Sequence, residues 1–473
     1  MRKMHKEQRF LLISFNHEIS PYPVMPLGAF YIKDYLEKNN ISVDIIDLYI
    51  EEDYKSLIKT LLSDDNYIAS GISIRNIDNI LFPSTISWID EIKEIVDYLR
   101  TVSDIPVILG GSGYSIFPRA MLQYCRADYG IKGEGEQILL TTLNNLDNAE
   151  FLSRIPNLYI LDSKDNTAGI PRELLETGAT FSDSWPSRDP ALTVPYIKTG
   201  GMISLQIKRG CPFNCIYCTY PDIDGRNIRI RKTQSLLEEI SHLKSSFDFD
   251  YFYFVDSIFN YPLQETKDFL LCLKKSGLKI KWTGFFNPKF IDREFLELTR
   301  DTGCDEIEFG IESGSEIILK DLEKGFSRKD IRKAKQISDE LGIRTMFYLL
   351  IGSPAETFQT IDESIAFIEE LSPDAVAVML GIRVYPNTRL YSHCISENQL
   401  SPDDPLLKPY FYIKDDIMEY ASKRFEFLGK NDPRWVVPSL GINYYPEKLI
   451  KLRKFGSKGP LWSRLKNTKS HKN

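Results

Sequence analysis

Short apolar runs alternate with helix-like stretches along most of this chain, and that alternation limits the fold more than any other feature. In the first 150 residues, five apolar runs occur at 10–15, 43–48, 67–74, 106–109 and 128–131. Helical patterns follow them at 28–38, 53–62, 86–100, 118–124 and 136–146. Strands that alternate with helices in this way indicate βαβ units and a parallel sheet. The sequence therefore predicts an α/β fold that begins with a Rossmann-like domain over residues 1–150.

The same alternation returns in the second half of the chain. Strand-like runs lie at 202–207, 251–255, 280–286, 306–311, 345–351 and 375–380. Helical patterns separate them at 234–243, 264–275, 293–302, 328–341 and 357–371. We therefore expect a second α/β domain over residues 199–400, joined to the first by a linker at 151–198 and followed by a C-terminal extension at 401–473.

Glycines and polar residues follow three strands of the first domain. The turns that hold them are Arg75-Asn76, Gly110-Gly111-Ser112 and Gly133-Glu134-Gly135-Glu136. Glycines at such turns let backbone N–H groups approach a bulky or anionic ligand. In parallel sheets ligands bind at the carboxyl ends of the strands, where these turns lie. Because no G-x-G-x-x-G follows the first strand, a dinucleotide is not the expected ligand.

Three of the seven cysteines, Cys211, Cys215 and Cys218, are grouped in the spacing C-x3-C-x2-C. Three thiolates on one loop can hold three irons of a [4Fe–4S] cluster and leave the fourth iron open to a ligand. A structural zinc site needs four ligands, and the nearest histidine, His242, lies well outside the loop. Clusters that only transfer electrons use four cysteines. The spacing therefore predicts a catalytic cluster.

This cysteine motif, with Tyr217 as its aromatic residue, resembles the signature of radical S-adenosylmethionine (SAM) enzymes. The resemblance implies that SAM binds the open iron and is cleaved there to a 5′-deoxyadenosyl radical. It also implies that the six βα units form a partial (β/α)6 barrel, with its chemistry at the carboxyl ends of the strands. Glu312 and Ser313 lie in a G-I-E-S-G-S segment whose Glu or Ser contacts ribose in relatives. Asp256 and Tyr348 are further candidates for contacts to SAM or substrate.

A Rossmann-like domain before such a barrel resembles the cobalamin-binding subfamily, in which Gly-Gly and Gly-Glu-Gly-Glu turns face the corrin. The D-x-H-x-x-G pattern that places a histidine below cobalt does not occur here. We expect His17 to be a loop residue rather than an axial ligand. Arg75 is the better candidate below the corrin, where a protonated guanidinium would keep strong donors away. An ion pair of Arg75 with Asp78 or a neighbouring residue is the equal alternative.

The resemblance implies three cofactors: a [4Fe–4S] cluster, SAM and cobalamin. The leading hypothesis is a methyltransferase that moves a methyl group from methylcobalamin to an unactivated carbon, or phosphorus, of a small-molecule, lipid or natural-product substrate. A non-methylating reaction, such as a cyclisation, ring contraction or oxidation, is the alternative, and a cobalamin-binding sensor is a third hypothesis. An external electron donor such as flavodoxin or ferredoxin is expected, and the chain is expected to act as a monomer.

Composition and charge narrow the cellular setting. Apolar residues make up 42% and charged residues 26%, and no apolar run approaches the length of a membrane span. Seven cysteines are too few for a disulfide framework, so a reducing cytoplasm is expected. The net charge is −7, although residues 448–473 carry nine Lys or Arg and no Asp or Glu. An acidic body argues against nucleic-acid binding, and the basic tail is expected to be solvated or to touch an anionic membrane weakly.

Overall fold

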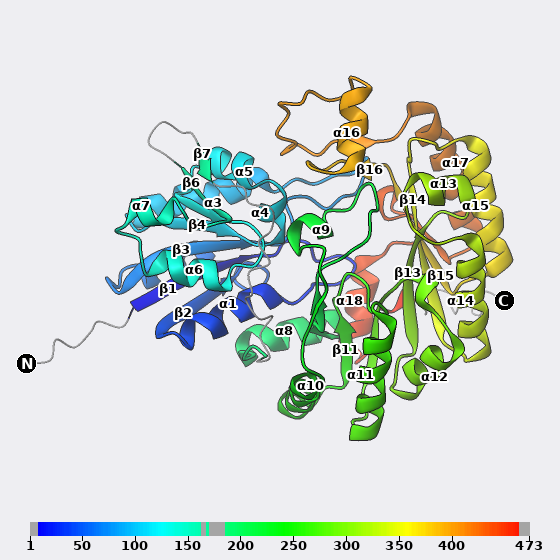
Figure 1. The fold of residues 1–473 in the computed structure, drawn as a ribbon, viewed down its shortest axis with the longest axis horizontal. Coiled ribbons are helices and arrows are strands. Elements are labelled where there is room, and N and C mark those ends of the chain that lie inside the picture. Colours follow the sequence, from blue (N-terminus) through cyan, green and yellow to red (C-terminus); the bar gives the residue numbers. More distant parts are fainter. Residues whose placement is uncertain (1–7, 162–166, 170–184, 463–473) are drawn as a thin grey trace, which may run out of the picture.

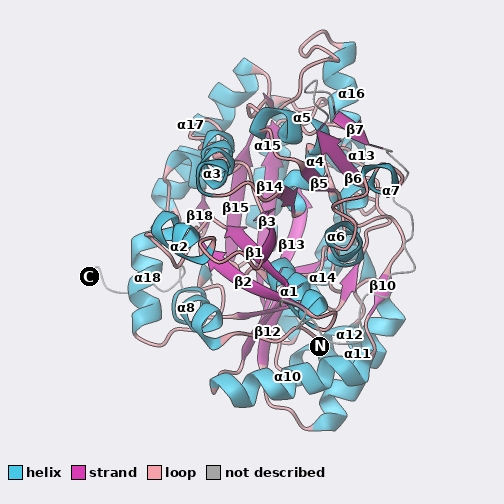
Figure 2. Ribbon diagram, turned by 90° about the vertical axis from the view of Figure 1, so that its left-hand side faces the viewer, coloured by secondary structure: helices cyan, strands magenta, loops and turns pink. Residues whose placement is uncertain are grey.

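The computed structural model describes residues 8–161, 167–169 and 185–462. Two seven-stranded sheets, each covered by helices, form two lobes that lie side by side (Figure 1). The N-terminal lobe holds strands β1–β7, and the second lobe holds most of the remaining chain. Viewed from the N-terminal lobe, the first sheet lies in front of the second (Figure 2). The predicted α/β class, with a parallel sheet domain before a partial barrel, is confirmed.

The first sheet has the strand order β2-β1-β3-β4-β5-β6-β7. Its first five strands are parallel, while β6 and β7 are antiparallel additions. The bounds are β1 (Gln8–Phe15), β2 (Ile41–Asp47), β3 (Tyr67–Ile74), β4 (Val107–Gly110), β5 (Tyr129–Ile131), β6 (Leu158–Leu161) and β7 (Thr167–Gly169). The sheet thus continues past residue 150 into the segment expected as a linker. Because β1 lies between β2 and β3, the chain reverses direction across the sheet there, which is where doubly wound sheets bind ligands.

Helices cover both faces of this sheet because its strands are apolar on both sides. Along β1, Phe10 and Leu12 pack with α1 and α6, whereas Leu11 and Ile13 pack with α3 and α5. The helices are α1 (Leu27–Glu37), α2 (Tyr54–Leu61), α3 (Ile89–Val102), α4 (Ser112–Ile116), α5 (Pro118–Cys125), α6 (Glu136–Leu143) and α7 (Ala149–Leu152).

The second sheet is an open, wholly parallel barrel with the strand order β18-β15-β14-β13-β12-β11-β8. Its strands are β8 (Ile203–Leu205), β11 (Tyr251–Phe254), β12 (Lys281–Phe286), β13 (Glu306–Glu312), β14 (Arg344–Ile351), β15 (Ala375–Leu380) and β18 (Trp435–Val436). Six of these strands match the predicted runs. The seventh, β18, comes from the C-terminal extension and pairs with β15, an addition that the sequence analysis missed because two residues carry no readable pattern.

Helices pack against the outer face of the barrel and leave its inner face to a cavity. Phe252 and Phe254 of β11 point outward into the helix layer, whereas Tyr253 points inward. The covering helices are α10 (Thr233–Phe247), α11 (Leu263–Ser276), α12 (Arg293–Asp301), α13 (Glu316–Asp321), α14 (Arg328–Glu340), α15 (Phe358–Leu371) and α17 (Asp415–Asn431).

Short elements connect the two lobes and close the barrel. They are α8 (Pro190–Gly200), β9 (Lys208–Arg209), α9 (Tyr220–Ile223), β10 (Arg229–Ile230), η1 (Pro288–Phe290), β16 (Ile382–Arg383), α16 (Arg389–Ser396), β17 (Phe411–Tyr412), η2 (Pro438–Leu440) and α18 (Pro446–Lys454). After α18 the chain passes back to the barrel, where Trp462 packs on Met346 and Ala377. Within the described ranges, no helix has the length and apolarity that a bilayer crossing requires.

The structure describes the basic C-terminal segment as far as Trp462. Arg453 is buried and donates to the backbone oxygen of Ser457, and Lys458 pairs with Asp250 of the barrel at 2.6 Å. This part of the segment packs on the body rather than extending into solvent as expected. Residues 463–473, with the remaining basic side chains, lie outside the described residues, and contact with a membrane stays a prediction.

Candidate cofactor and substrate site

One cavity of about 1210 Å³ joins the two lobes. Its walls come from four parts of the chain: the strand ends of the first sheet, the region after the cysteine loop, the inner face of the barrel, and the segment from Pro433 to Trp462. The predicted turns at Arg75-Asn76, Gly110–Ser112 and Gly133–Glu136 all line it. The carboxyl edges of both sheets thus open into one space.

The Gly110–Ser112 turn has no room for a side chain. Gly111 has φ +94°, and a Cβ placed there would lie 2.4 Å from the backbone oxygen of Ile74. Ser112 Oγ donates to the backbone oxygen of Arg75 at 3.0 Å, which joins this turn to the one after β3. The two turns therefore form a continuous backbone surface at the cavity wall, against which a large flat ligand can pack.

Arg75 lies on the cavity wall and forms no ion pair within the described ranges. Burial lowers its pKa from the ordinary value, although a guanidinium stays protonated at neutral pH. The alternative ion pair with Asp78 is wrong, because Asp78 instead accepts from Arg383 Nε at 3.1 Å. His17 does not line the cavity and lies 3.0 Å from Glu91. Of the two candidates, only Arg75 is placed to face a cofactor.

The carboxylates of the Gly133–Glu136 turn join the two lobes. Glu136 accepts from Arg209 Nη2 at 3.0 Å, and Glu134 lies 3.5 Å from Arg209 and also pairs with Arg229. Burial alone would raise the pKa of Glu136, but Arg209 outweighs it and holds that pKa below its ordinary value. Both carboxylates were expected to bind cofactor. Their side chains pair with arginines of the second lobe, while all four residues of the turn still line the cavity.

The cysteine loop runs between β9 and α9. Cys211 N donates to the oxygen of Gly225 at 2.9 Å, and Cys218 N donates to the oxygen of Cys215 at 3.1 Å. In the described residues no three His, Cys, Asp or Glu side chains lie close enough to share one metal ion. Cluster cysteines bind different irons, so they are spaced more widely than the ligands of a single ion. The loop therefore suits a cluster better than a zinc ion.

A carboxylate and an ammonium group lie beside this loop. Tyr217 Oη donates to Glu312 Oε1 at 3.0 Å, and Lys324 Nζ donates to the same oxygen at 3.2 Å. Burial lowers the pKa of Lys324, but Glu312 and Cys215 outweigh that effect and raise it. Glu312 has φ +64°, a backbone conformation that costs energy outside glycine and is typical of functional sites. Glu312 and Tyr217 thus lie together near the cysteines.

Two other predicted contacts lie behind the site rather than in it. Asp256 Oδ1 accepts from the backbone N–H groups of Ile207 and Lys208 at 2.9 and 2.7 Å, just before the cysteine loop. Burial raises the pKa of Asp256 to about 6. Ser313 Oγ lies 2.9 Å from Ser364 Oγ. Neither side chain lines the cavity, and the same holds for Tyr217, Glu312 and the three cysteines. We interpret Asp256 and Ser313 as supports of the turns that form it.

The inner face of the barrel contains a carboxylate that the sequence analysis did not single out. Glu308 of β13 is buried and lines the cavity. Tyr348, which was predicted, donates to Glu308 Oε2 at 2.7 Å, and Trp462 Nε1 donates to Glu308 Oε1 at 3.3 Å. The alternating glutamates of the run E-I-E-F were the available signal, because alternate residues of a barrel strand face its interior. Trp462 carried no such signal.

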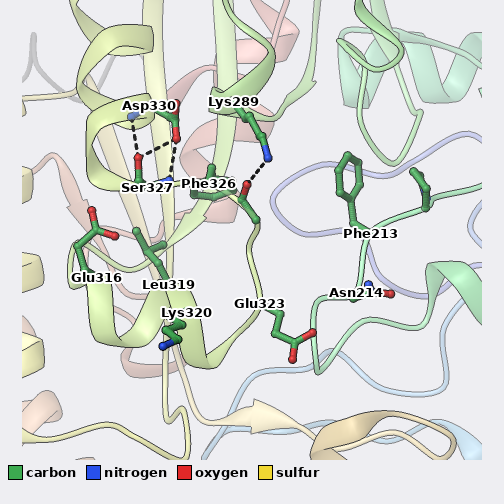
Figure 3. Close-up of a pocket in the computed structure, with 12 residues that line it drawn as sticks. Phe213, Asn214, Lys289, Glu316, Leu319, Lys320, Glu323, Phe326, Ser327 and Asp330 are labelled. Carbon is green, nitrogen blue, oxygen red and sulfur yellow. Dashed lines mark hydrogen bonds between the residues drawn. The ribbon is translucent and has the colours of Figure 1, made fainter.

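A second, more open pocket of about 620 Å³ lies on the outer side of the cysteine loop (Figure 3). Phe213 and Asn214 of the loop form one wall, and residues of α13 form another. Lys289 Nζ donates to the oxygen of Gly325 at 2.9 Å across its floor. This pocket exposes one side of the cysteine loop to approach from outside.

Comparison with known families matches each lobe to one family. Residues 19–142 match the B12 binding domain, and residues 205–368 match the radical SAM superfamily. The chain is a cobalamin-dependent radical SAM enzyme. Its cofactors are therefore cobalamin, a [4Fe–4S] cluster and SAM, and the Cys211–Cys218 loop falls inside the radical SAM match.

Individual members of this family resemble the chain over most of its length. An uncharacterized methyltransferase of Pyrococcus horikoshii is 24% identical, with 85% of this chain and 86% of the relative covered. Tryptophan 2-C-methyltransferase of Streptomyces laurentii is 24% identical over 78% of this chain and 72% of the relative. The solved structure of TsrM, a radical SAM methyltransferase from Kitasatospora setae, has a TM-score of 0.85 at 21% identity and covers 97% of both chains. That structure was solved with tryptophan and a SAM analogue bound.

Proposed function

We propose that this enzyme methylates a small molecule held in the barrel, using cobalamin in the first lobe as the methyl carrier. The observation that carries this proposal is the single cavity, which brings the corrin-type turns, the region after the cysteine loop and the barrel interior into one space. The methyltransferase names of its full-length relatives favour methyl transfer over cyclisation, ring contraction or oxidation. When bound, cobalamin supplies a methyl-carrying cobalt, and the cluster with SAM supplies methyl groups and one-electron chemistry.

The residues of the chain bind, orient and exclude water in this proposal. The turns at Gly110–Gly113 and Gly133–Gly135 form the surface for the corrin, with Arg75 and Asn76 at its lower face. Cys211, Cys215 and Cys218 hold the cluster. Enzymes of this type leave the hard chemistry to their cofactors and contribute positioning, which here requires the two lobes to keep a fixed separation.

SAM binding next to the cluster is proposed for the group around Tyr217 and Glu312. The hydrogen bonds among Tyr217, Glu312 and Lys324 hold a carboxylate and two donors in place beside Cys215. The Glu312 carboxylate and the Lys324 ammonium group offer both signs of charge to SAM, which carries an amino group, a carboxylate and ribose hydroxyls. Ser313 and Asp256 contribute by fixing the adjacent turns.

An external electron donor is proposed to approach at the outer pocket, since Phe213 and Asn214 place the cysteine loop against it. The donor is of the flavodoxin or ferredoxin type. A monomer is proposed as the working unit, because one chain supplies every wall of the cavity.

Anaerobic reconstitution tests the proposed function. The protein is loaded with iron, sulfide and cobalamin, supplied with reductant and SAM carrying a deuterated methyl group, and incubated with small-molecule extracts. The expected result is a label first on cobalamin and then on one extract component, whose mass rises by one labelled methyl group. Cys215→Ala should lose the iron absorbance and the labelled product, while Cys272→Ala, at an exposed cysteine, should lose neither. Formation of unlabelled deoxyadenosine and labelled methionine without any methylated product would favour the non-methylating alternative instead.

A further inference from the structure

Glu308 is a buried carboxylate without a cation. Its side chain accepts from the hydroxyl of Tyr348 and the indole N–H of Trp462, both neutral donors, and it forms no ion pair in the part of the chain that the structure describes. Taking a carboxylate out of water costs several kcal/mol unless a positive charge compensates it. Burial raises the pKa of Glu308 to about 7, which is the direction expected for an uncompensated group.

No cation is among the groups that act on Glu308, and Arg75, a cavity-wall cation without an ion pair in the described ranges, acts on Glu18 and Tyr22 instead. The other cations nearby are committed elsewhere. Arg453, which interacts with Tyr22, donates to the backbone oxygens of Ser457 and Gly459. Lys448 of the cavity wall lies over the ring of Tyr445, 3.9 Å from its centre. Arg209, also on the wall, pairs with the carboxylates of the first lobe. A positive charge beside Glu308 is therefore left for a ligand to supply.

Aromatic rings surround the carboxylate on the inner face of the barrel. Tyr22, Tyr253, Phe285 and Tyr348 form a continuous series with successive ring centres 6.3, 6.1 and 5.6 Å apart. All four line the cavity, as does Trp462. The faces of aromatic rings attract cations, and a carboxylate within such a cage is a recurrent arrangement for binding an organic ammonium group.

The position of Glu308 separates this subsite from the cluster. Glu308 lies beside Phe285 of β12 and Met346 of β14, four residues before Glu312 on the same strand. At about 3.3 Å per residue, the two carboxylates are at most on the order of 13 Å apart along the strand, because its register shifts between Phe309 and Glu312. A ligand at Glu308 therefore sits deeper in the barrel than the cysteine loop, with Trp462 closing the space behind it.

From these observations we propose that the substrate carries a positively charged nitrogen, which Glu308 binds inside the aromatic cage of Tyr22, Tyr253, Phe285, Tyr348 and Trp462. This inference rests on the proposed function, since it names the class of molecule that the barrel accepts. Glu308 then selects for amines over alcohols and acids of the same shape. Tyr348 and Trp462 act as positioning residues by orienting its two oxygens.

Two matched series of ligands test the inference by calorimetric titration of the reconstituted full-length enzyme. One series is phenethylamine, 2-phenylethanol and phenylacetate, and the other is tryptamine, tryptophol and indole-3-acetate. We expect at least one amine to bind tenfold or more tightly than its matched alcohol and acid. Near pH 7, buffers of different ionisation enthalpy should reveal proton release as the bound cation ionises Glu308.

Glu308→Gln keeps the shape and removes the charge. It should weaken amine binding at least tenfold, abolish proton release and leave alcohol binding unchanged, while Glu308→Asp should retain the preference for amines. Glu426→Gln, on the exposed face of α17, is the matched control and should behave as wild type. Equal binding of amine and alcohol, unchanged amine binding by Glu308→Gln, or no amine binding at millimolar concentration would overturn the inference. So would a loss confined to SAM binding, because SAM would then be the cation at Glu308.

The outcome is separable from that of the proposed function. Transfer of a methyl group from SAM to cobalamin can be followed by the corrin spectrum without any substrate. If that transfer fails while amines bind as described, the proposed function is contradicted and the amine subsite stands. If cobalamin is methylated but amines do not bind preferentially, the amine subsite alone is contradicted.

Discussion

Arg209 donates to Glu136 at 3.0 Å across the boundary between the two lobes. Arg209 stands two residues before Cys211, and Glu136 ends the Gly133–Glu136 turn at the corrin side of the cavity. The loop for one cofactor and the turn for another are therefore joined by a partly buried, charge-assisted hydrogen bond. This bond, with Arg229 and Glu134 beside it, holds the two halves of the cavity at a set separation.

Arg209→Ala is expected to loosen that connection. It leaves the partly buried Glu136 without its main partner, and breaking a charge-assisted pair of this kind costs about 2 kcal/mol. Chemical denaturation should show that loss, and the reconstituted variant should retain less cobalamin after gel filtration. Arg332→Ala, which removes an exposed pair with Glu370, should change stability by at most about 1 kcal/mol. Full cobalamin retention by Arg209→Ala would contradict the joining role.

Arg75→His tests whether Arg75 faces the lower side of cobalt. An imidazole nitrogen there is a good cobalt ligand, whereas a guanidinium is not. In the reduced Co(II) state, an axial nitrogen splits the electron paramagnetic resonance lines of cobalt. We expect that splitting in Arg75→His and its absence in both the wild type and Arg75→Lys. Identical spectra for all three proteins would place Arg75 away from cobalt.

Gly111→Ala should cost more than an ordinary glycine replacement. Both the positive φ and the 2.4 Å approach to the oxygen of Ile74 oppose a Cβ at this position. We expect a loss of about 3 kcal/mol together with weaker cobalamin binding. Gly277→Ala is the matched control, because Gly277 also has positive φ (+72°) but no atom near its Cβ position. Its cost should be about 1 kcal/mol, without any effect on cobalamin.

Glu308→Gln should change how stability depends on pH. The pKa of Glu308 is raised from 4.5 to about 7 in the folded state, so between these values the folded protein keeps a proton that the unfolded chain has released. Wild-type stability should therefore fall relative to the variant as pH rises from 4.5 to 7, by up to about 3 kcal/mol.

Denaturant titrations at pH 5 and pH 8 measure this difference, with Glu426→Gln as the reference. Tyr348 and Trp462 donate to the carboxylate and Glu306 lies on the same strand. Since neither donor titrates below pH 8, the change in this range is assigned to Glu308. If the stability difference between wild type and Glu308→Gln were the same at pH 5 and at pH 8, the raised pKa of Glu308 would be contradicted.

The strands and the cofactor turns were readable from the sequence because both depend on local patterns. The runs predicted at 67–74 and 375–380 coincide with β3 and β15, and other strand ends shift by a residue or two. The cluster cysteines and the glycine turns could be predicted because each forms a short motif in the sequence. Successive side chains of a strand face opposite sides of the sheet, so the residues that face the cavity could also be predicted. Tyr348 is an example.

Contacts between distant segments were not readable. Glu134 and Glu136 were expected at the cofactor, but their partners Arg209 and Arg229 come from the other lobe. Asp78 pairs with Arg383, about 300 residues away, rather than with Arg75. Glu308 could be recognised as a candidate binding residue only from the folded structure, where its hydrogen-bond partners are neutral. Each of these depends on how the lobes pack, which a linear pattern does not record.

The cavity wall begins at Phe10 and ends at Trp462, and this span sets an order of events during synthesis. A ribosome releases the chain from its N-terminus, so the first sheet can fold while the barrel is still unmade. The cavity lacks the part of its wall formed by Trp462 until that residue has left the ribosomal exit tunnel. A nascent chain therefore cannot trap substrate or shield radical intermediates until Trp462 has emerged and packed on Met346 and Ala377.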